Sequence, residues 1–110
     1  MGSMVRRGAG IVGSFVLLVA TALAAQERSP AGVRGEQLFV NQGCYGCHLV
    51  GKFGTPIGPD LSRLGAKYAP PYLRRWLRDP EAVRATAHMP KLELTAEEIE
   101  SLAAYLASLR

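Results

Sequence analysis

Cysteine is scarce in this chain, with only two in 110 residues. Two cysteines cannot build the dense disulfide framework of a small secreted scaffold. Aromatic residues make up 7% of the chain, the formal net charge is only +4, and no stretch interleaves basic and aromatic side chains. The composition therefore argues against a nucleic-acid-binding protein. The length leaves room for one domain at most.

Charge is also sparse, at 20% of the residues against 48% hydrophobic residues, which excludes an intrinsically disordered chain. Beyond residue 24 the sequence offers no carboxylate pair, no nucleophile beside a base and no phosphate-binding loop. We therefore expect no catalytic centre built from side chains alone. A small enzyme is not excluded by length, but a cofactor would have to supply its chemistry.

The first 25 residues have the composition of an address signal. Arg6 and Arg7 precede an apolar run over 9–25, and Ala22-Leu23-Ala24 matches an A-x-A cleavage pattern. We predict a signal peptide over 1–24 and a periplasmic location. The alternative is an uncleaved membrane anchor, because a run of about 17 residues lies at the lower limit of what spans a bilayer. In both cases the rest of the protein works outside the cytoplasm.

The remaining chain reads as a polar linker over 25–32 and one domain over 33–110. Helices are expected over 33–42 (ended by Gly43), in a short turn over 60–65 (ended by Gly65), and from Pro71 to Asp79-Pro80. A capping box over 95–98 opens a last helix with apolar residues at helical spacing. No convincing strand is found. We predict an all-α fold of three to five short helices, with long loops wrapped around a bound group.

The sequence Cys44-Tyr45-Gly46-Cys47-His48 is a C-x-x-C-H motif, the pattern of covalent haem attachment. Two thiols one helical turn apart can add to the two vinyl groups of one haem, and the adjacent His48 then reaches the iron. Three alternatives compete. A thioredoxin-like pair lacks its βαβ setting, a disulfide would close a very small loop, and a zinc site would need His88 as its fourth ligand. The export signal and the histidine favour one covalently bound haem c.

Met89 is the candidate for the second axial ligand, because it is the only methionine beyond residue 24. It precedes a proline in a loop before the last helix, and its neighbours form no apolar face, which argues against a core-filling role. His88 is the alternative ligand, and otherwise an exposed loop residue. Trp76 is assigned to the haem pocket, either as a donor to a haem propionate or as plain core.

These features resemble the mono-haem class I cytochromes c from about Val33 to Leu109. The C-Y-G-C-H motif carries the resemblance most specifically. The further matching segments are I-G-P-D-L at 57–61, Y-L-R-R-W-L-R-D-P at 72–80 and Met89-Pro90. One departure stands out, since many members have Pro-Gly shortly before the Met-Pro pair and this chain has R-A-T-A-H at 84–88.

The resemblance implies roles for several residues. The carbonyl of Pro59 would accept a hydrogen bond from His48, and Leu61 would pack on the haem. The first and last helices would cross, with Gly35 lying against Leu102 or Tyr105.

We expect one-electron transfer between redox partners by a haem with His48 and Met89 as ligands, since this ligand pair favours reduced iron. Basic residues outnumber acidic ones between 61 and 92, and they would dock an acidic redox donor or acceptor. A solvated helix face explains them equally well. The alternatives are a haem subunit of a larger oxidoreductase, as in sulfur-compound or alcohol oxidation, and a haem gas-binding protein. A membrane partner is expected only if the N-terminal segment stays uncleaved.

Overall fold

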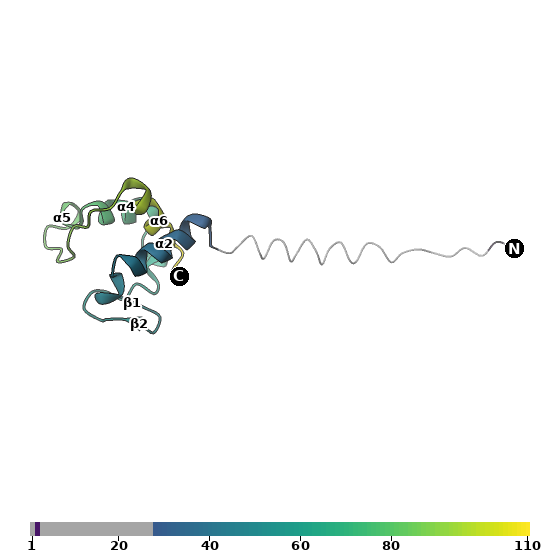
Figure 1. The fold of residues 1–110 in the computed structure, drawn as a ribbon, viewed down its shortest axis with the longest axis horizontal. Coiled ribbons are helices and arrows are strands. Elements are labelled where there is room, and N and C mark those ends of the chain that lie inside the picture. The colour runs from purple at the N-terminus through teal and green to yellow at the C-terminus, as the bar shows by residue number, and fades with distance from the viewer. Residues whose placement is uncertain (1, 3–27) are drawn as a thin grey trace.

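The computed structural model describes residues 28–110 and Gly2. Apart from Gly2, the predicted signal peptide lies outside the described residues. The elements follow in the order α2 (Pro30–Asn41), η1 (Cys44–Gly46), β1 (Leu49–Val50), β2 (Phe53–Gly54), α3 (Leu64–Lys67), α4 (Pro70–Arg78), α5 (Pro80–Val83) and α6 (Ala96–Ala107). In Figure 1, α2 and α6 lie together at the centre of the domain, with the β1–β2 segment on one side and α4 and α5 on the other.

Helix α2 begins three residues earlier than its pattern of apolar residues predicted. The side chain of Ser29 accepts a hydrogen bond from the Gly32 N–H at 3.1 Å, and Pro30 occupies the first helical position. Both features start a helix, so the first turn lies within the predicted linker 25–32. The helix ends where predicted, because Gly43 takes a left-handed φ of 76° just beyond it.

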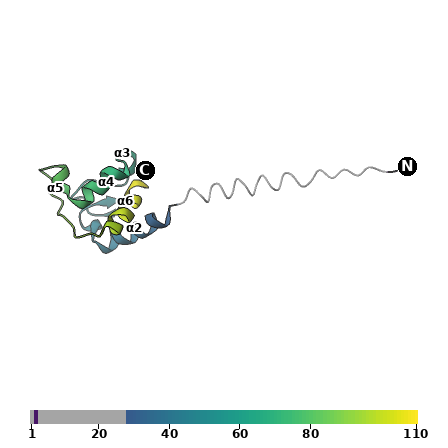
Figure 2. The ribbon, with the colours of Figure 1, turned by 90° about the horizontal axis from the view of Figure 1, so that it is seen from above.

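The two longest of these helices, α2 and α6, pack along each other, as both views of the ribbon show (Figures 1 and 2). Gly35 is buried at this contact. A Cβ atom built on Gly35 would overlap the carbonyl group of Ser101 and would lie 2.8 Å from the Cβ of Tyr105. The predicted crossing of the first and last helices is confirmed, with the backbone of Ser101 as the nearest neighbour.

Helix α6 begins at the predicted capping box. The Glu98 N–H donates to Thr95 Oγ1 at 3.1 Å, and the Thr95 N–H donates to Glu98 Oε1 at 3.0 Å. The apolar face of α6 packs on α2 and α4 and forms most of the core. The buried apolar residues are Phe39, Leu61, Leu73, Leu77, Ile99, Leu102, Ala103, Tyr105 and Leu106.

The segment before α4 differs from the prediction. The expected turn over 60–65 is displaced to α3, and Gly65 lies inside this helix instead of ending it. The Gly65 N–H donates to the Leu109 carbonyl at 2.7 Å, so α3 packs against the end of α6. The chain is extended at Ala69, as the following proline requires, and this separates α3 from α4.

A small antiparallel hairpin was not predicted. It pairs Leu49 with Gly54 and Val50 with Phe53. Strands of two residues are too short to leave an alternating pattern in a sequence. The hairpin follows His48 directly, and the Thr55 N–H donates to the His48 carbonyl at 3.3 Å. Within residues 28–110, no helix is both long and apolar enough to cross a membrane.

Candidate haem-binding site

The C-x-x-C-H motif folds as one closed turn. Gly43 leads the chain out of α2, and η1 starts at Cys44. The amides of Cys47 and His48 both donate to the Cys44 carbonyl, at 3.1 and 2.9 Å. Cys44 is half-buried, Cys47 is exposed, and the two form no disulfide. The turn therefore presents two free thiols from its two ends, as the spacing predicted.

The structure gives no support for the zinc alternative in the part of the chain that it describes. Among residues 28–110, no three histidine, cysteine or acidic side chains lie close enough together to hold a metal ion. His88 is exposed in the loop before α6, as expected if it is not a ligand. Burial raises the pKa of the Cys44 thiol, and the neighbouring Cys47 adds to the rise.

His48 is oriented by the loop that faces it. Its Nδ1 lies 2.8 Å from the carbonyl oxygen of Pro59. Because a carbonyl only accepts, Nδ1 carries the proton and Nε2 keeps a lone pair. A Cβ built on Gly58 would lie 2.7 Å from His48 Cε1, so the loop packs against the imidazole ring more closely than any side chain at this position would allow. This is the contact that the resemblance implied, and it leaves Nε2 available for iron.

Three polar contacts hold this loop in place. The N–H and the hydroxyl of Ser62 both donate to Asp60 Oδ1, at 2.8 and 2.6 Å, and the Gly51 N–H donates to Ser62 Oγ at 2.7 Å. The hydrogen bonds from Ser62 lower the pKa of Asp60. Leu61 lies between them, buried, with its N–H on the Leu49 carbonyl at 2.9 Å. The sequence analysis did not predict these hydrogen bonds, although an aspartate two residues before a serine is a known turn signal.

Met89 packs against the edge of the core. The indole N–H of Trp76 donates to the Met89 sulfur at 3.2 Å. The sequence suggested a haem propionate or the core for Trp76; in the structure its N–H contacts the thioether, and its assignment to the haem pocket stays a prediction. A thioether sulfur has two lone pairs, so Met89 can accept this hydrogen bond and still donate to a metal.

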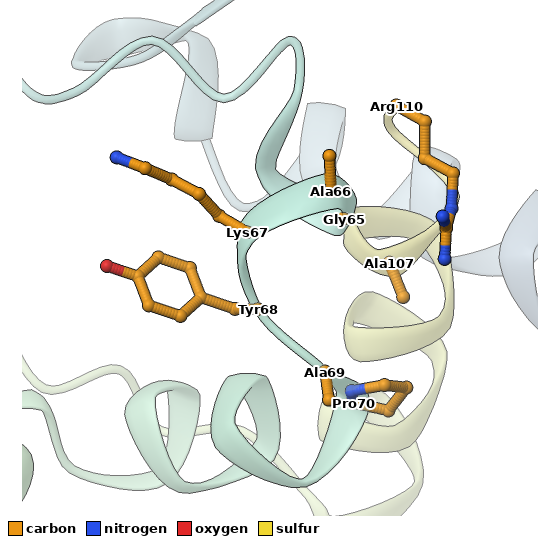
Figure 3. A pocket seen from close by; sticks show the side chains of 8 residues that line it. All are labelled: Gly65, Ala66, Lys67, Tyr68, Ala69, Pro70, Ala107 and Arg110. Carbon is orange, nitrogen blue, oxygen red and sulfur yellow. The ribbon is translucent and has the colours of Figure 1, made fainter.

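An open hollow of about 350 Å³ lies elsewhere on the domain, between α3, the start of α4 and the end of α6 (Figure 3). Its lining residues are Gly65, Ala66, Lys67, Tyr68, Ala69, Pro70, Ala107 and Arg110. None of the predicted haem-site residues is among them. The candidate donor groups lie in the C-x-x-C-H turn and in the Met89 loop, and neither segment lines this hollow.

The donor set fits one covalently attached haem c. It offers two thiols a turn apart, an imidazole with a free Nε2 and a thioether with a free lone pair, next to an apolar core. Residues 32–110 match the family described as cytochrome c. The chain belongs to the cytochrome c family. The predicted fold is thereby confirmed, haem c is the cofactor of this cytochrome domain, and its function is electron transfer.

The relatives of this cytochrome domain are named as subunits of oxidases and of a reductase. It is 34% identical over 86 residues to cytochrome c oxidase subunit 2 of Alkalihalophilus pseudofirmus, a match that covers 70% of this chain and 25% of the relative. It is 27% identical over 86 residues to a subunit of the nitric oxide reductase of Stutzerimonas stutzeri, covering 73% of this chain and 59% of the relative. Cytochrome c oxidase subunit 2 of Bacillus sp. (strain PS3) is 32% identical over 100 residues, with 74% and 27% covered. The chain thus spans a quarter to three fifths of these relatives.

Proposed function

We propose that the domain carries one electron at a time between redox partners outside the cytoplasm, on a haem c with His48 and Met89 as its axial ligands. Cys44 and Cys47 would hold the haem through thioether bonds. One observation carries the proposal. Each candidate ligand is fixed by one hydrogen bond and keeps one donor pair free, His48 by Pro59 and Met89 by Trp76.

When bound, haem c supplies a reversible one-electron couple of ferric and ferrous iron. The chain's own residues set the conditions. Pro59 and Gly58 hold the imidazole of His48 in one orientation, so the ligand need not move when the electron arrives. A thioether ligand favours ferrous iron. Leu61 and the adjoining core exclude water, which disfavours the extra charge of ferric iron.

Carbon monoxide tests this function against a gas-binding one. In the proposed carrier Met89 occupies the sixth position, so the ferrous protein is expected to keep its spectrum when carbon monoxide is added. A single one-electron wave is expected in a redox titration. A rapid spectral shift at low carbon monoxide concentration would contradict the proposal, because it would show an open or weakly held position. The Met89→Ala variant serves as the positive control for such binding.

A second candidate is an electron-transfer subunit of a larger oxidoreductase. The names of the relatives favour it, since all three are subunits and each is longer than the match. The test is extraction of the native protein with a mild detergent, followed by gel filtration with detection of haem absorbance. Elution at the mass of a single domain supports the free carrier. Co-elution with a fixed set of other chains supports the role within a complex.

Export through a signal peptide at 1–24 remains part of the proposal. The haem-bearing protein is expected in the periplasmic fraction with Ala25 at or within one residue of its N-terminus. Sequencing of the N-terminus after fractionation measures this. A protein that starts at Met1 and stays in the membrane fraction supports the anchor instead.

We propose that the partner docks on basic side chains around α4. Arg75 and Arg78 are exposed on this helix, and Arg84 follows it. Arg74 already binds Glu100 at 3.0 Å, so it is less free to meet a partner. Rates with an acidic partner are expected to fall steeply with ionic strength. A rate that is independent of salt would contradict a charged docking surface.

A further inference from the structure

Three aromatic residues at a spacing of four form a row of rings that starts at the end of α3 and continues on α4. The rings of Tyr68 and Tyr72 are stacked, with centroids 4.3 Å apart and planes 12° from parallel. The rings of Tyr72 and Trp76 are stacked as well, at 6.5 Å and 18°. We call Tyr68, Tyr72 and Trp76 the aromatic row.

The aromatic row ends on the candidate iron ligand, because the Trp76 N–H donates to the Met89 sulfur at 3.2 Å. A second aromatic cluster of the domain is arranged differently. Phe39 meets Tyr45 at 85° and Tyr105 at 61°, which are the edge-to-face contacts of ordinary core packing. The rings of the row are instead near-parallel, and the closer of the two contacts is the one between Tyr68 and Tyr72.

We infer that the aromatic row is an electron route between Met89 and the surface at Tyr68. The inference rests on the proposed function, because it takes Met89 as the iron ligand. One electron passes from a one-electron donor protein docked at Tyr68 to the ferric haem. The donor is oxidised, the iron is reduced, and no bond in the row forms or breaks.

Two arginines lie over rings of the aromatic row and make those rings harder to oxidise. The guanidinium of Arg75 lies 5.8 Å from the centroid of the Tyr72 ring, and that of Arg84 lies 6.0 Å from the centroid of the Trp76 ring. A cation over a ring stabilises the neutral ring and makes it harder to oxidise. The rings therefore bridge donor and iron in a single step and do not hold the charge themselves.

The outer end of the row lies at the rim of the hollow described above. Figure 3 shows the side chains of Tyr68 and Lys67 extending to the same side of α3, with the Tyr68 hydroxyl directed away from the helix backbone. Lys67 is exposed. A donor protein with acidic groups around its redox centre fits this end of the row.

The test uses the full haem-loaded protein with a photoactive ruthenium complex on an introduced cysteine. Cys44 and Cys47 are consumed by thioether bonds, so Lys67→Cys supplies a single reactive thiol beside Tyr68. A second protein carries the label at Lys52→Cys, which is exposed in the hairpin and outside the row. Flash photolysis then measures the rate of electron transfer from each label to the haem, with and without Tyr72→Leu.

Tyr72→Leu is expected to slow transfer from position 67 severalfold and to leave transfer from position 52 unchanged. Tyr72→Phe keeps the ring and is expected to keep both rates. Near-ultraviolet circular dichroism provides a readout that does not depend on transfer, since the signal of the stacked tyrosines should be lost in Tyr72→Leu and retained in Tyr72→Phe. If Tyr72→Leu does not fold, Tyr68→Leu at the outer end replaces it.

Equal rates from position 67 in Tyr72→Leu and the parent protein would overturn the inference, and so would equal slowing from both labels. The proposed ligation has a separate readout. If the ferric spectrum shows no sulfur ligand, the proposed function fails. If that spectrum is intact and the rates ignore Tyr72, only the electron route fails.

Discussion

Gly35 gives the sharpest test of the helix crossing on which the domain is built. The chain offers a matched control, because Gly32 lies one turn earlier in the same helix. Both positions are buried in α2. The atoms nearest to a Cβ built on Gly32 belong to the side chains of Ser29 and Arg28, at 3.4 Å or more, whereas a Cβ built on Gly35 would overlap the backbone carbonyl of Ser101.

The expected effects have opposite signs. Alanine at either position removes the flexibility of glycine from the unfolded chain, which stabilises by about 0.4–1 kcal/mol where the side chain fits. Gly32→Ala is expected to show this gain. Gly35→Ala forces apart two backbones that cannot swing aside, so overpacking should cost about 1–3 kcal/mol. A net loss of about 2 kcal/mol lowers the Tm of a domain of this size by roughly 8–16 °C.

Thermal unfolding of the ferric haem protein, followed by far-ultraviolet circular dichroism and by haem absorbance, measures both variants. The account expects Gly35→Ala to melt well below the parent protein and Gly32→Ala at or slightly above it. If Gly35→Ala proves as stable as Gly32→Ala, the close approach of α2 to α6 at Ser101 is refuted.

Three further predictions concern the site and its surroundings. Trp76→Phe removes the N–H that draws electron density from the Met89 sulfur, so the reduction potential should fall by roughly 20–60 mV, the equivalent of one hydrogen bond, and an unchanged potential in a redox titration would argue against that bond. Replacing Cys44 and Cys47 together with serine should abolish the haem-stained band on a denaturing gel, and a stained band would disprove covalent attachment through them. Burial raises the pKa of Tyr105 to about 12, so the folded protein holds this proton more tightly than the unfolded chain. Its contribution to stability should be full below pH ~10 and lost as the pH rises toward 12, a loss that urea melts should show to be smaller in Tyr105→Phe.

The sequence predicted the ends of helices well where a particular residue type starts or ends a helix. The capping box at Thr95 and Glu98, the left-handed glycine at Gly43 and the Asp79-Pro80 break all act within one turn of chain. Apolar spacing places the start of α2 at 33, but the helix begins at Pro30, because the Ser29-Pro30 pair starts a helix without any apolar residue. Gly65 does not end a helix, because it lies where the backbone of α3 packs against the end of α6. Its partner Leu109 is distant in sequence, so no local pattern predicts this contact.

In the site too, the local features could be predicted from the sequence and the contacts between distant segments could not. The spacing of Cys44, Cys47 and His48 is a local property, so the sequence predicted their turn. The orientation of His48 by Pro59 came only from the family resemblance. The hydrogen bond from Trp76 to Met89 links α4 to the loop before α6, and no local pattern in the sequence predicts it. The aromatic row had a visible signal, a spacing of four residues from Tyr68 to Trp76, but the spacing alone does not distinguish stacked rings from a core stripe.

The ferric absorption spectrum of three proteins tests the central claim most directly. A weak charge-transfer band at the red end of the visible range reports a sulfur ligand on ferric low-spin haem. The account predicts this band in the parent protein and in His88→Ala, and predicts its loss in Met89→Ala, since no other methionine follows residue 24. A band that survives Met89→Ala, or a parent spectrum that changes only in His88→Ala, would contradict ligation by His48 and Met89.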